Sequence, residues 1–210
     1  MLFRSTSGDL SYTFTFLKGA KDVGQGNLFD IEDITLDVKE NSSVALFSGG
    51  LDSLAGALEL LNTTSQNLIL ISHHSNNFAV AKIQRNIFNL LSSDYPGRLQ
   101  HLPFSCSLHG ERAVEETQRT RIFLYTSIAF SLMSLADKKQ IYVFENGMTS
   151  INFYKRQDMM NARASRTTHP QTIFLLQKFF SSVAESSISI KHPFLFSTKT
   201  DVFEKIKKYN

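Results

Sequence analysis

The residues best suited to chemistry lie in one short segment, where an apolar run at 44–47 gives way to a helical pattern that continues to Leu61. In order, the segment reads Phe47, Ser48, Gly49, Gly50, Leu51, Asp52 and Ser53. The glycines permit a tight turn and a close approach of an anion to the backbone, and the first N–H groups of the helix point to the same place. The two serine hydroxyls can donate further hydrogen bonds to the anion. The segment therefore predicts a phosphate-binding loop.

Asp52 is the exception in this loop, because a carboxylate repels a phosphate unless a cation lies between them. We therefore predict that Asp52 holds Mg²⁺ and takes part in catalysis. The alternative is an ordinary glycine turn in which Asp or Ser caps the helix. The loop is not a Walker A motif, because it lacks the lysine and the longer glycine spacing of that pattern.

Arginines at the start of a predicted helix form the second candidate feature. Arg119 and Arg121 stand where the helical pattern at 120–136 begins, and a cation there opposes the helix dipole unless an anion compensates it. We expect Arg121 to stabilise the charge that develops on a phosphate in the transition state. A surface salt bridge to Glu115 or Glu116 is the alternative.

A later segment supplies candidate substrate ligands. Arg163 and Arg166 are three residues apart, and their guanidinium groups suit a carboxylate or a phosphate. Together with Thr167 and His169 they form the candidate substrate-binding set. His169 could act as a general base or hydrogen-bond donor near neutral pH, and a structural turn with Pro170 is the alternative.

Polar side chains also follow two of the apolar runs. His73 comes after the run at 68–71, and Glu145 and Asn146 come directly after the run at 141–144. Open α/β sheets bind ligands beyond the carboxyl ends of their strands, so we expect all three in a nucleotide site. Glu145 could help to hold Mg²⁺ and Asn146 could bind nucleotide or substrate, with a capped structural turn as the alternative.

Four apolar runs predict the strands that position these residues, and helical patterns separate them. The predicted strands are 44–47, 68–71, 99–104 and 141–144, and the predicted helices are those that follow the loop to Leu61, 78–91 and 120–136. This alternation predicts an α/β fold with a parallel sheet covered by helices on both faces. Residues 1–40 are predicted to be a lead-in segment with short strands, and residues 41–210 one domain.

The loop closely resembles the PP-loop signature of the N-type ATP pyrophosphatases, which include asparagine synthetases, GMP synthetases, tRNA-thiolating enzymes and 7-cyano-7-deazaguanine synthases. Further segments look like the 7-cyano-7-deazaguanine synthase branch, particularly its divergent relatives in bacterial anti-phage defence operons. These segments are 116–124, 145–152, 162–170, His192-Pro193-Phe194 and Thr198-Lys199-Thr200. The resemblance spans roughly residues 42–205 and implies the Rossmann-like fold of the adenine nucleotide alpha hydrolases.

This resemblance implies an ATP-dependent ligase that requires Mg²⁺ and forms AMP and pyrophosphate. In the family, the loop holds the β,γ-pyrophosphate while 7-carboxy-7-deazaguanine attacks the α-phosphorus, and ammonia then converts the adenylate through an amide to a nitrile. The resemblance also places His73 near the adenine and ribose. It brings Lys199 to the pyrophosphate as a catalytic residue, with a solvated lysine as the alternative.

Two departures from the biosynthetic enzymes change the expected chemistry. Their zinc-binding cysteine cluster has no counterpart, because Cys106 is the one cysteine of this chain, and zinc is therefore not expected. Their Asp-Cys-Arg segment is replaced by residues 166–170, so activation of a carboxylate for attack by ammonia or an amine is expected rather than a nitrile. The alternative is a nucleotide-binding defence-complex component with little or no turnover.

Composition narrows the class of protein and its partners. With 42% hydrophobic and 20% charged residues, the 210-residue chain has the values of a globular domain. The net charge of +3 is scattered, so nucleic acid is not an expected partner. No apolar run approaches the roughly 18 residues of a membrane span, which predicts a cytoplasmic protein. The 18 phenylalanines make a homodimer one candidate assembly, and defence-operon proteins are the other candidate partners.

Overall fold

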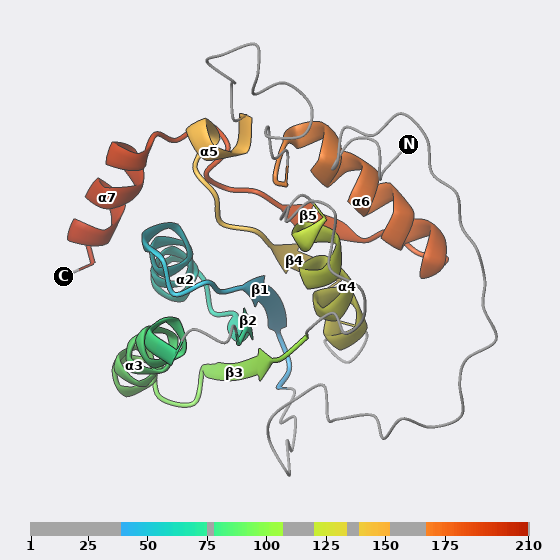
Figure 1. Cartoon of the computed structure of the whole chain (residues 1–210). Coiled ribbons are helices and arrows are strands. Elements are labelled where there is room, and N and C mark those ends of the chain that lie inside the picture. The colour runs from blue at the N-terminus through green and yellow to red at the C-terminus, as the bar shows by residue number, and fades with distance from the viewer. Residues whose placement is uncertain (1–38, 75–77, 107–119, 134–138, 152–166, 210) are drawn as a thin grey trace.

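The computed structural model describes residues 39–74, 78–106, 120–133, 139–151 and 167–209 (Figure 1). The strands are β1 (Ser42–Leu46), β2 (Asn67–His73), β3 (Leu99–Phe104), β4 (Gln140–Tyr142) and β5 (Ser189–Lys191). The helices are α2 (Leu51–Thr63), α3 (Phe78–Asp94), α4 (Arg121–Met133), α5 (Gly147–Ile151), α6 (Pro170–Val183) and α7 (Lys199–Lys207). Predictions for residues 1–38 and for Arg119, Arg163 and Arg166 concern residues outside these ranges.

The five strands form one parallel sheet in the order β3-β2-β1-β4-β5. The central strand β1 pairs with β2 on one side and with β4 on the other, so that Val44 lies between Ile69 and Ile141. This arrangement confirms the predicted α/β class and parallel sheet, in a Rossmann-like form. All four predicted strands are present, and β5 adds a strand that the sequence patterns did not indicate.

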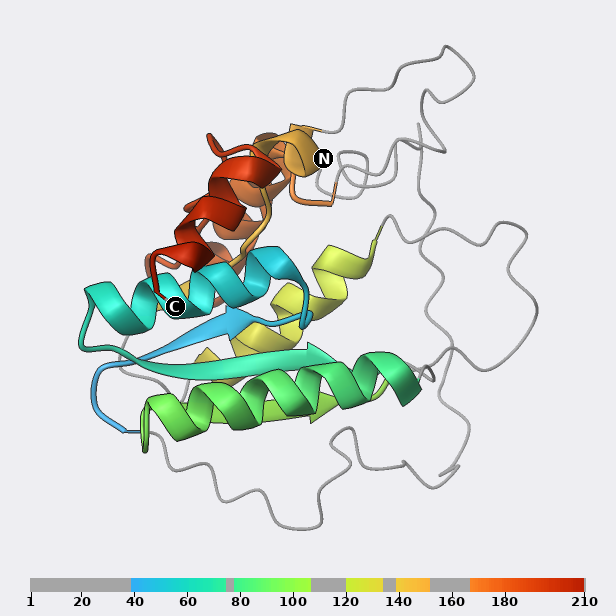
Figure 2. The same cartoon turned by 90° about the vertical axis from the view of Figure 1, so that its left-hand side faces the viewer.

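Helices cover both faces of the sheet, which explains why its strands are apolar runs rather than alternating patterns. Val44 and Ile69 belong to a core packed against α4 and α6. Their neighbours Ala45 and Leu70 point the other way, into a core packed against α2, α3 and α7. Figure 2 shows these three helices over the nearer face of the sheet.

The last helix of the chain returns to the first strand–helix unit. Val202 of α7 is fully buried in the core shared with α2, and Lys205 of α7 forms an ion pair of 2.9 Å with Glu59 of α2. A capping box formed by Thr198 and Asp201 fixes the start of α7. These contacts set the position of Lys199, the first residue of the helix.

The backbone at Gly147 packs closely against residues 195–197, which lead into α7. A Cβ atom at this position would lie 2.1 Å from the carbonyl oxygen of Leu195, and the Gly147 N–H donates to the Ser197 carbonyl at 2.8 Å. Only glycine leaves room for this contact. The start of α5 therefore lies directly against the segment that leads into α7.

None of the helices in the described ranges is long and apolar enough to span a membrane.

Candidate functional site

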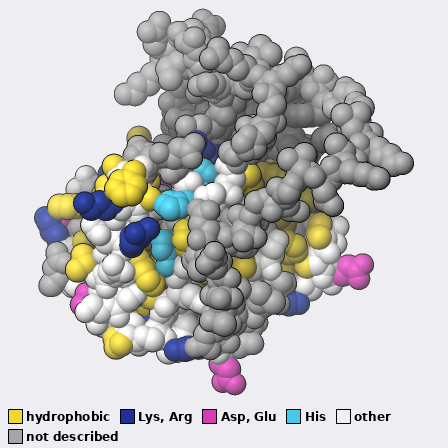
Figure 3. Space-filling model, turned by 60° about the horizontal axis from the view of Figure 1, so that its bottom comes forward, with side chains coloured by type: hydrophobic (Ala, Val, Ile, Leu, Met, Phe, Trp, Pro, Cys, Tyr) yellow, Lys and Arg dark blue, Asp and Glu magenta, His cyan; other side chains and the backbone are white. Residues whose placement is uncertain are grey.

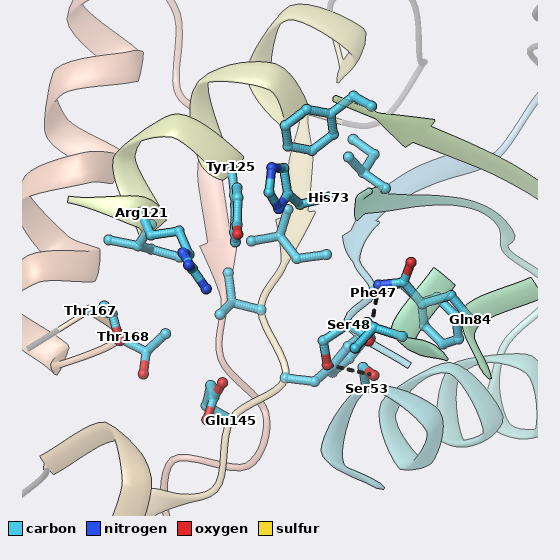
Figure 4. A pocket seen from close by; sticks show the side chains of 17 residues that line it. Phe47, Ser48, Ser53, His73, Gln84, Arg121, Tyr125, Glu145, Thr167 and Thr168 are labelled. Carbon is cyan, nitrogen blue, oxygen red and sulfur yellow. Dashed lines mark hydrogen bonds between the residues drawn. The ribbon is translucent and has the colours of Figure 1, made fainter. Parts of the chain in front are cut away.

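A cavity of about 440 Å³ lies at the carboxyl edge of the sheet (Figure 4). Its walls come from the β1–α2 loop, the end of β2, α3, the start of α4, the segment after β4 and the segment before α6. The labelled lining residues are Phe47, Ser48, Ser53, His73, Gln84, Arg121, Tyr125, Glu145, Thr167 and Thr168. Seven of these were predicted from the sequence as site residues, namely Phe47, Ser48, Ser53, His73, Arg121, Glu145 and Thr167. The fold thus brings into one cavity residues that lie far apart in the sequence.

The loop between β1 and α2 is a tight turn held by its own serines. Gly49 adopts a φ of +75°, a conformation that side chains disfavour. The Ser53 hydroxyl donates to the Gly50 carbonyl at 2.9 Å and lies 3.2 Å from the Ser48 hydroxyl. The N-cap of α2 is Gly50, and it makes no side-chain capping bond. The alternative in which Asp or Ser caps this helix therefore does not describe the loop.

Two side chains from other elements hold the carbonyl groups of this loop. The Ser72 hydroxyl at the end of β2 donates to the Phe47 carbonyl at 2.6 Å. The Gln84 amide on α3 donates to the Ser48 carbonyl at 3.1 Å. Both Ser72 and Gln84 are buried. The carbonyls are therefore satisfied by the protein itself, as buried backbone groups require.

His101 on β3 supports the first of these bonds. Its Nε2 lies 2.8 Å from the Ser72 oxygen, and because Ser72 gives its proton to a carbonyl, that oxygen accepts from His101. Burial, together with the charges of His74 and Arg85, lowers the pKa of His101 to about 4. The ring is therefore neutral at pH 7 with its proton on Nε2.

The surface shown in Figure 3 carries histidine side chains beside lysine and arginine side chains.

Asp52 is buried and accepts hydrogen bonds at both carboxylate oxygens. Its Oδ1 accepts from the Lys199 ammonium at 2.9 Å. Its Oδ2 accepts from the Asn146 side-chain amide at 2.8 Å and from the Asn146 backbone N–H at 3.3 Å. The Thr149 N–H donates to Asn146 Oδ1 at 3.0 Å, which fixes the orientation of the amide. Asn146 therefore contacts Asp52 and is not among the residues that line the cavity, and Lys199 lies beside the loop as an ion-pair partner.

Glu145 lines the cavity close to this cluster. Burial and, to a lesser extent, the negative charge of nearby Asp52 raise the pKa of Glu145 to about 7, while the positive charge of Lys199 opposes the shift. The Glu145 carboxyl can therefore gain or lose a proton near neutral pH.

The opposite wall of the cavity is formed by α4. Arg121 is the first residue of that helix and points toward the cavity in Figure 4. Within the ranges that the structure describes, its guanidinium makes no hydrogen bond or ion pair. Tyr125 follows one turn later, and its ring stacks on His73 with ring centroids 5.5 Å apart and planes at 29°. Burial raises the pKa of the Tyr125 hydroxyl, and the nearby Arg121 charge opposes this.

The segment before α6 is tied to the end of β4 by a chain of polar side chains. Thr168 donates to the Ser150 hydroxyl at 3.2 Å, and Ser150 lies 3.0 Å from His192 Nε2. The same nitrogen lies 3.0 Å from the Glu145 carbonyl, and burial lowers the pKa of His192. These contacts tie Thr168 to the segment that carries Glu145, and both residues line the cavity (Figure 4).

His169 lies outside the cavity, whereas a general base would have to face the substrate. It is the N-cap of α6, its Nδ1 accepts from the Gln171 N–H at 3.2 Å, and it does not line the cavity. This geometry agrees with the structural alternative stated for the His-Pro turn.

The carboxylates near the cavity suit a cation that would also bind oxygens of a ligand. Among the described residues, no three His, Cys, Asp or Glu side chains gather as a metal site. Asp52 and Glu145 nevertheless provide two neighbouring carboxylates beside a phosphate-type loop. Mg²⁺ commonly takes one or two carboxylates and completes its shell with water and phosphate oxygens.

Sequence patterns did not single out Gln84, Tyr125, Ser72 or Thr168. A signal for Gln84 was present, because Ala81, Gln84 and Leu91 share the buried face of α3, and a polar residue on an apolar face needs a partner. Tyr125 and Ser72 are recognisable only from the strands and helices that pack around them.

Comparisons with known proteins add little to this description. No protein-family model matches the sequence, and no curated protein matches it. Among solved structures, the chain is similar to a crystal structure of a predicted subunit of tRNA methyltransferase from Methanocaldococcus jannaschii. The TM-score is 0.44 and the identity 12%, over 78% of this chain and 72% of that chain. A similarity of this size carries no argument about activity, so the molecule is defined by its own fold and cavity as a Rossmann-like α/β protein.

Proposed function

We propose that the cavity binds ATP with Mg²⁺ and that the protein cleaves ATP to AMP and pyrophosphate while it activates a carboxylate for attack by ammonia or an amine. One observation supports this most strongly. The cavity is lined by Ser48 and Ser53 of the loop and by Arg121 on the facing helix, so that a phosphate chain held by the loop would extend toward a guanidinium. The PP-loop resemblance of the same residues supports the choice of ATP.

The proposed roles follow from the positions of the side chains. The loop N–H groups and serine hydroxyls would hold the β,γ-phosphates, and the aromatic pair of His73 and Tyr125 offers a flat surface for the base or for the substrate. Arg121 would stabilise the charge on the α-phosphate as it grows in the transition state. A carboxylate oxygen would bond to the α-phosphorus as the bond to the pyrophosphate oxygen breaks, and the amine would then displace AMP from the acyl carbon and lose a proton.

Asp52 and Glu145 would hold the cation, which when bound neutralises phosphate charge. A cation would favour the ionised form of Glu145, so its binding should release a proton near pH 7. The resemblance supports 7-carboxy-7-deazaguanine or a related carboxylate as substrate, a cytoplasmic location and a role in anti-phage defence.

A second candidate function is supported by the hydrogen bonds that Asp52 already accepts. Both of its oxygens already accept hydrogen bonds, from Lys199 and from Asn146, so holding a cation requires Lys199 to move. A chain in which this pair stays closed would bind nucleotide without turnover. We therefore retain a nucleotide-binding component of a defence complex as the alternative.

Product analysis separates these possibilities. The protein is incubated with Mg²⁺ and ATP, with and without 7-carboxy-7-deazaguanine and ammonium, and AMP is resolved from ADP. AMP that depends on the carboxylate supports the proposal. ATP binding without AMP supports the alternative, and ADP as product contradicts cleavage at the α-phosphorus. Asp52→Asn should abolish AMP formation, and Lys207→Ala, which alters an exposed ion pair with Glu204, should not.

A further inference from the structure

The two carbonyl groups at the start of the loop are both turned away from solvent by protein donors. Ser72 holds the Phe47 carbonyl and Gln84 holds the Ser48 carbonyl. The described peptide bonds are all trans, and a trans peptide places its C=O and N–H on opposite sides. Holding the Ser48 carbonyl toward α3 therefore turns the Gly49 N–H away from α3.

The Gln84 side chain is buried and packed tightly against the loop. Its side chain is only 3% exposed although it is polar and belongs to a helix whose neighbouring residues 82, 83, 85 and 86 are exposed. A Cβ atom at Gly49 would lie 2.8 Å from Gln84 Cγ, so the amide stem packs directly on the loop glycine. A methionine of similar size could fill the same space, and only the amide can donate to the carbonyl.

From this geometry we infer that Gln84 is a positioning residue that sets the direction of the loop dipoles and so makes the loop selective for phosphate. The inference rests on the proposed function for its physiological ligand. If the Ser48 carbonyl is not held, that peptide can rotate and present an oxygen to the anion instead of an N–H. Such a loop would still fold, but it would repel the phosphate that it now binds.

Binding measurements with three ligands test this role without any need for turnover. The dissociation constants of ATP, inorganic pyrophosphate and adenosine are measured by calorimetry for the full chain and for Gln84→Met. We expect ATP and pyrophosphate to bind roughly threefold to tenfold more weakly, as the loss of one neutral hydrogen bond predicts, while adenosine binding is unchanged. Asn89→Met, at an exposed position on the same helix, is the control and should change none of the three.

Gln84→Glu keeps the size and polarity of the side chain and tests the same role where methionine is not tolerated. The ionised carboxylate cannot donate to the Ser48 carbonyl, whereas the protonated form can. Relative to the unaltered protein at each pH, pyrophosphate binding by Gln84→Glu should therefore be weak at pH 8 and recover at pH 5. Adenosine binding by this variant should match that of the unaltered protein at both pH values, whereas a structural effect of the buried charge would weaken both ligands at pH 8.

The outcomes are distinct. Unchanged pyrophosphate affinity in Gln84→Met, or equal weakening of adenosine and ATP, overturns the inference and leaves the proposed function standing. Pyrophosphate binding that depends on Gln84, without carboxylate-dependent AMP formation, supports the inference and contradicts the proposed function. If the unaltered protein binds neither ATP nor pyrophosphate, both fail.

Discussion

The two facing walls of the cavity differ in how completely the protein satisfies their charged groups. On the loop wall, Asp52 has partners at both oxygens, and the Ser48 carbonyl is held by Gln84. On the α4 wall, the Arg121 guanidinium has no hydrogen bond or ion pair within the described ranges. A cation at a helix N-terminus is unfavourable without an anion, so the ligand is expected to supply one. The loop wall is thus held by protein contacts within the described ranges, and the α4 wall is expected to be completed by a ligand.

Replacing Asp52 should give the largest effect, because it removes the carboxylate that Lys199 and Asn146 hold beside the loop. Asp52→Ala is expected to lower the rate of AMP formation by about 10²–10³-fold, as the loss of a main electrostatic group does. It should also lower the free energy of unfolding by about 1–3 kcal/mol, because it leaves the buried Asn146 amide and Lys199 without their acceptor. Single-turnover rates and urea unfolding measure the two effects. A full rate in this variant would contradict the proposed place of Asp52 in catalysis.

Replacing Arg121 should separate activity from stability. Arg121→Gln is expected to lower the rate of AMP formation by about 10–100-fold while the free energy of unfolding changes by less than about 0.5 kcal/mol. The reason is that its proposed partner is the ligand rather than the protein. The same rate assay and unfolding curve test this, with Arg85→Gln as the control on the exposed face of α3. A large loss of stability would show that the α4 wall is also held by protein contacts.

The pH dependence of stability should show the smallest effect. The pKa of Glu145 is raised to about 7 in the folded protein, so between its ordinary value and pH 7 the folded state holds a proton that the unfolded chain has lost. This contribution is present at low pH and is lost as pH rises through 7. The free energy of unfolding should therefore fall by about 1–2 kcal/mol more in the unaltered protein than in Glu145→Gln between pH 5 and pH 8.

The comparison with Glu145→Gln matters because other groups titrate in the same range. Burial lowers the pKa of His101 to about 4 and also lowers that of His192, so each contributes stability that is lost as pH falls. Both histidines are present in the two proteins, and their effect cancels in the difference. Equal pH dependence in the two proteins would contradict a raised pKa at Glu145.

Much of the fold was predictable because its strands are buried on both faces. Such strands are short apolar runs, and those at 44–47, 68–71, 99–104 and 141–144 were recognised within a few residues of their observed bounds. β5 was not, because it has three residues with Ile190 as its one buried apolar side chain. Its pairing with β4 is decided by the packing of α6, which a local pattern does not contain.

The candidate site was predictable where its functional side chains belong to one short segment of the sequence. The loop and Arg121 combine residue type with position at a helix start, and Phe47, Ser48 and Ser53 of the loop line the cavity together with Arg121. The partners of Asp52 were not predictable, since Asn146 and Lys199 meet it only through the sheet order and the return of α7. Asn146 was expected to bind a ligand; in the fold it donates to the Asp52 carboxylate, and its role toward a ligand stays a prediction. The proposed metal, nucleotide and substrate roles stay predictions.

The distance along the chain between Asp52 and its partners has a consequence for synthesis. Asn146 lies 94 positions after Asp52 in the sequence, and Lys199 lies 147 positions after it. At about 5–20 residues per second, the carboxylate waits roughly 7–30 s on the ribosome for its ammonium partner. During that time it cannot be buried at low cost, because a lone charge in a core is strongly disfavoured. The loop is therefore expected to reach its final form only after α7 has been made, although its own residues emerge well before that helix.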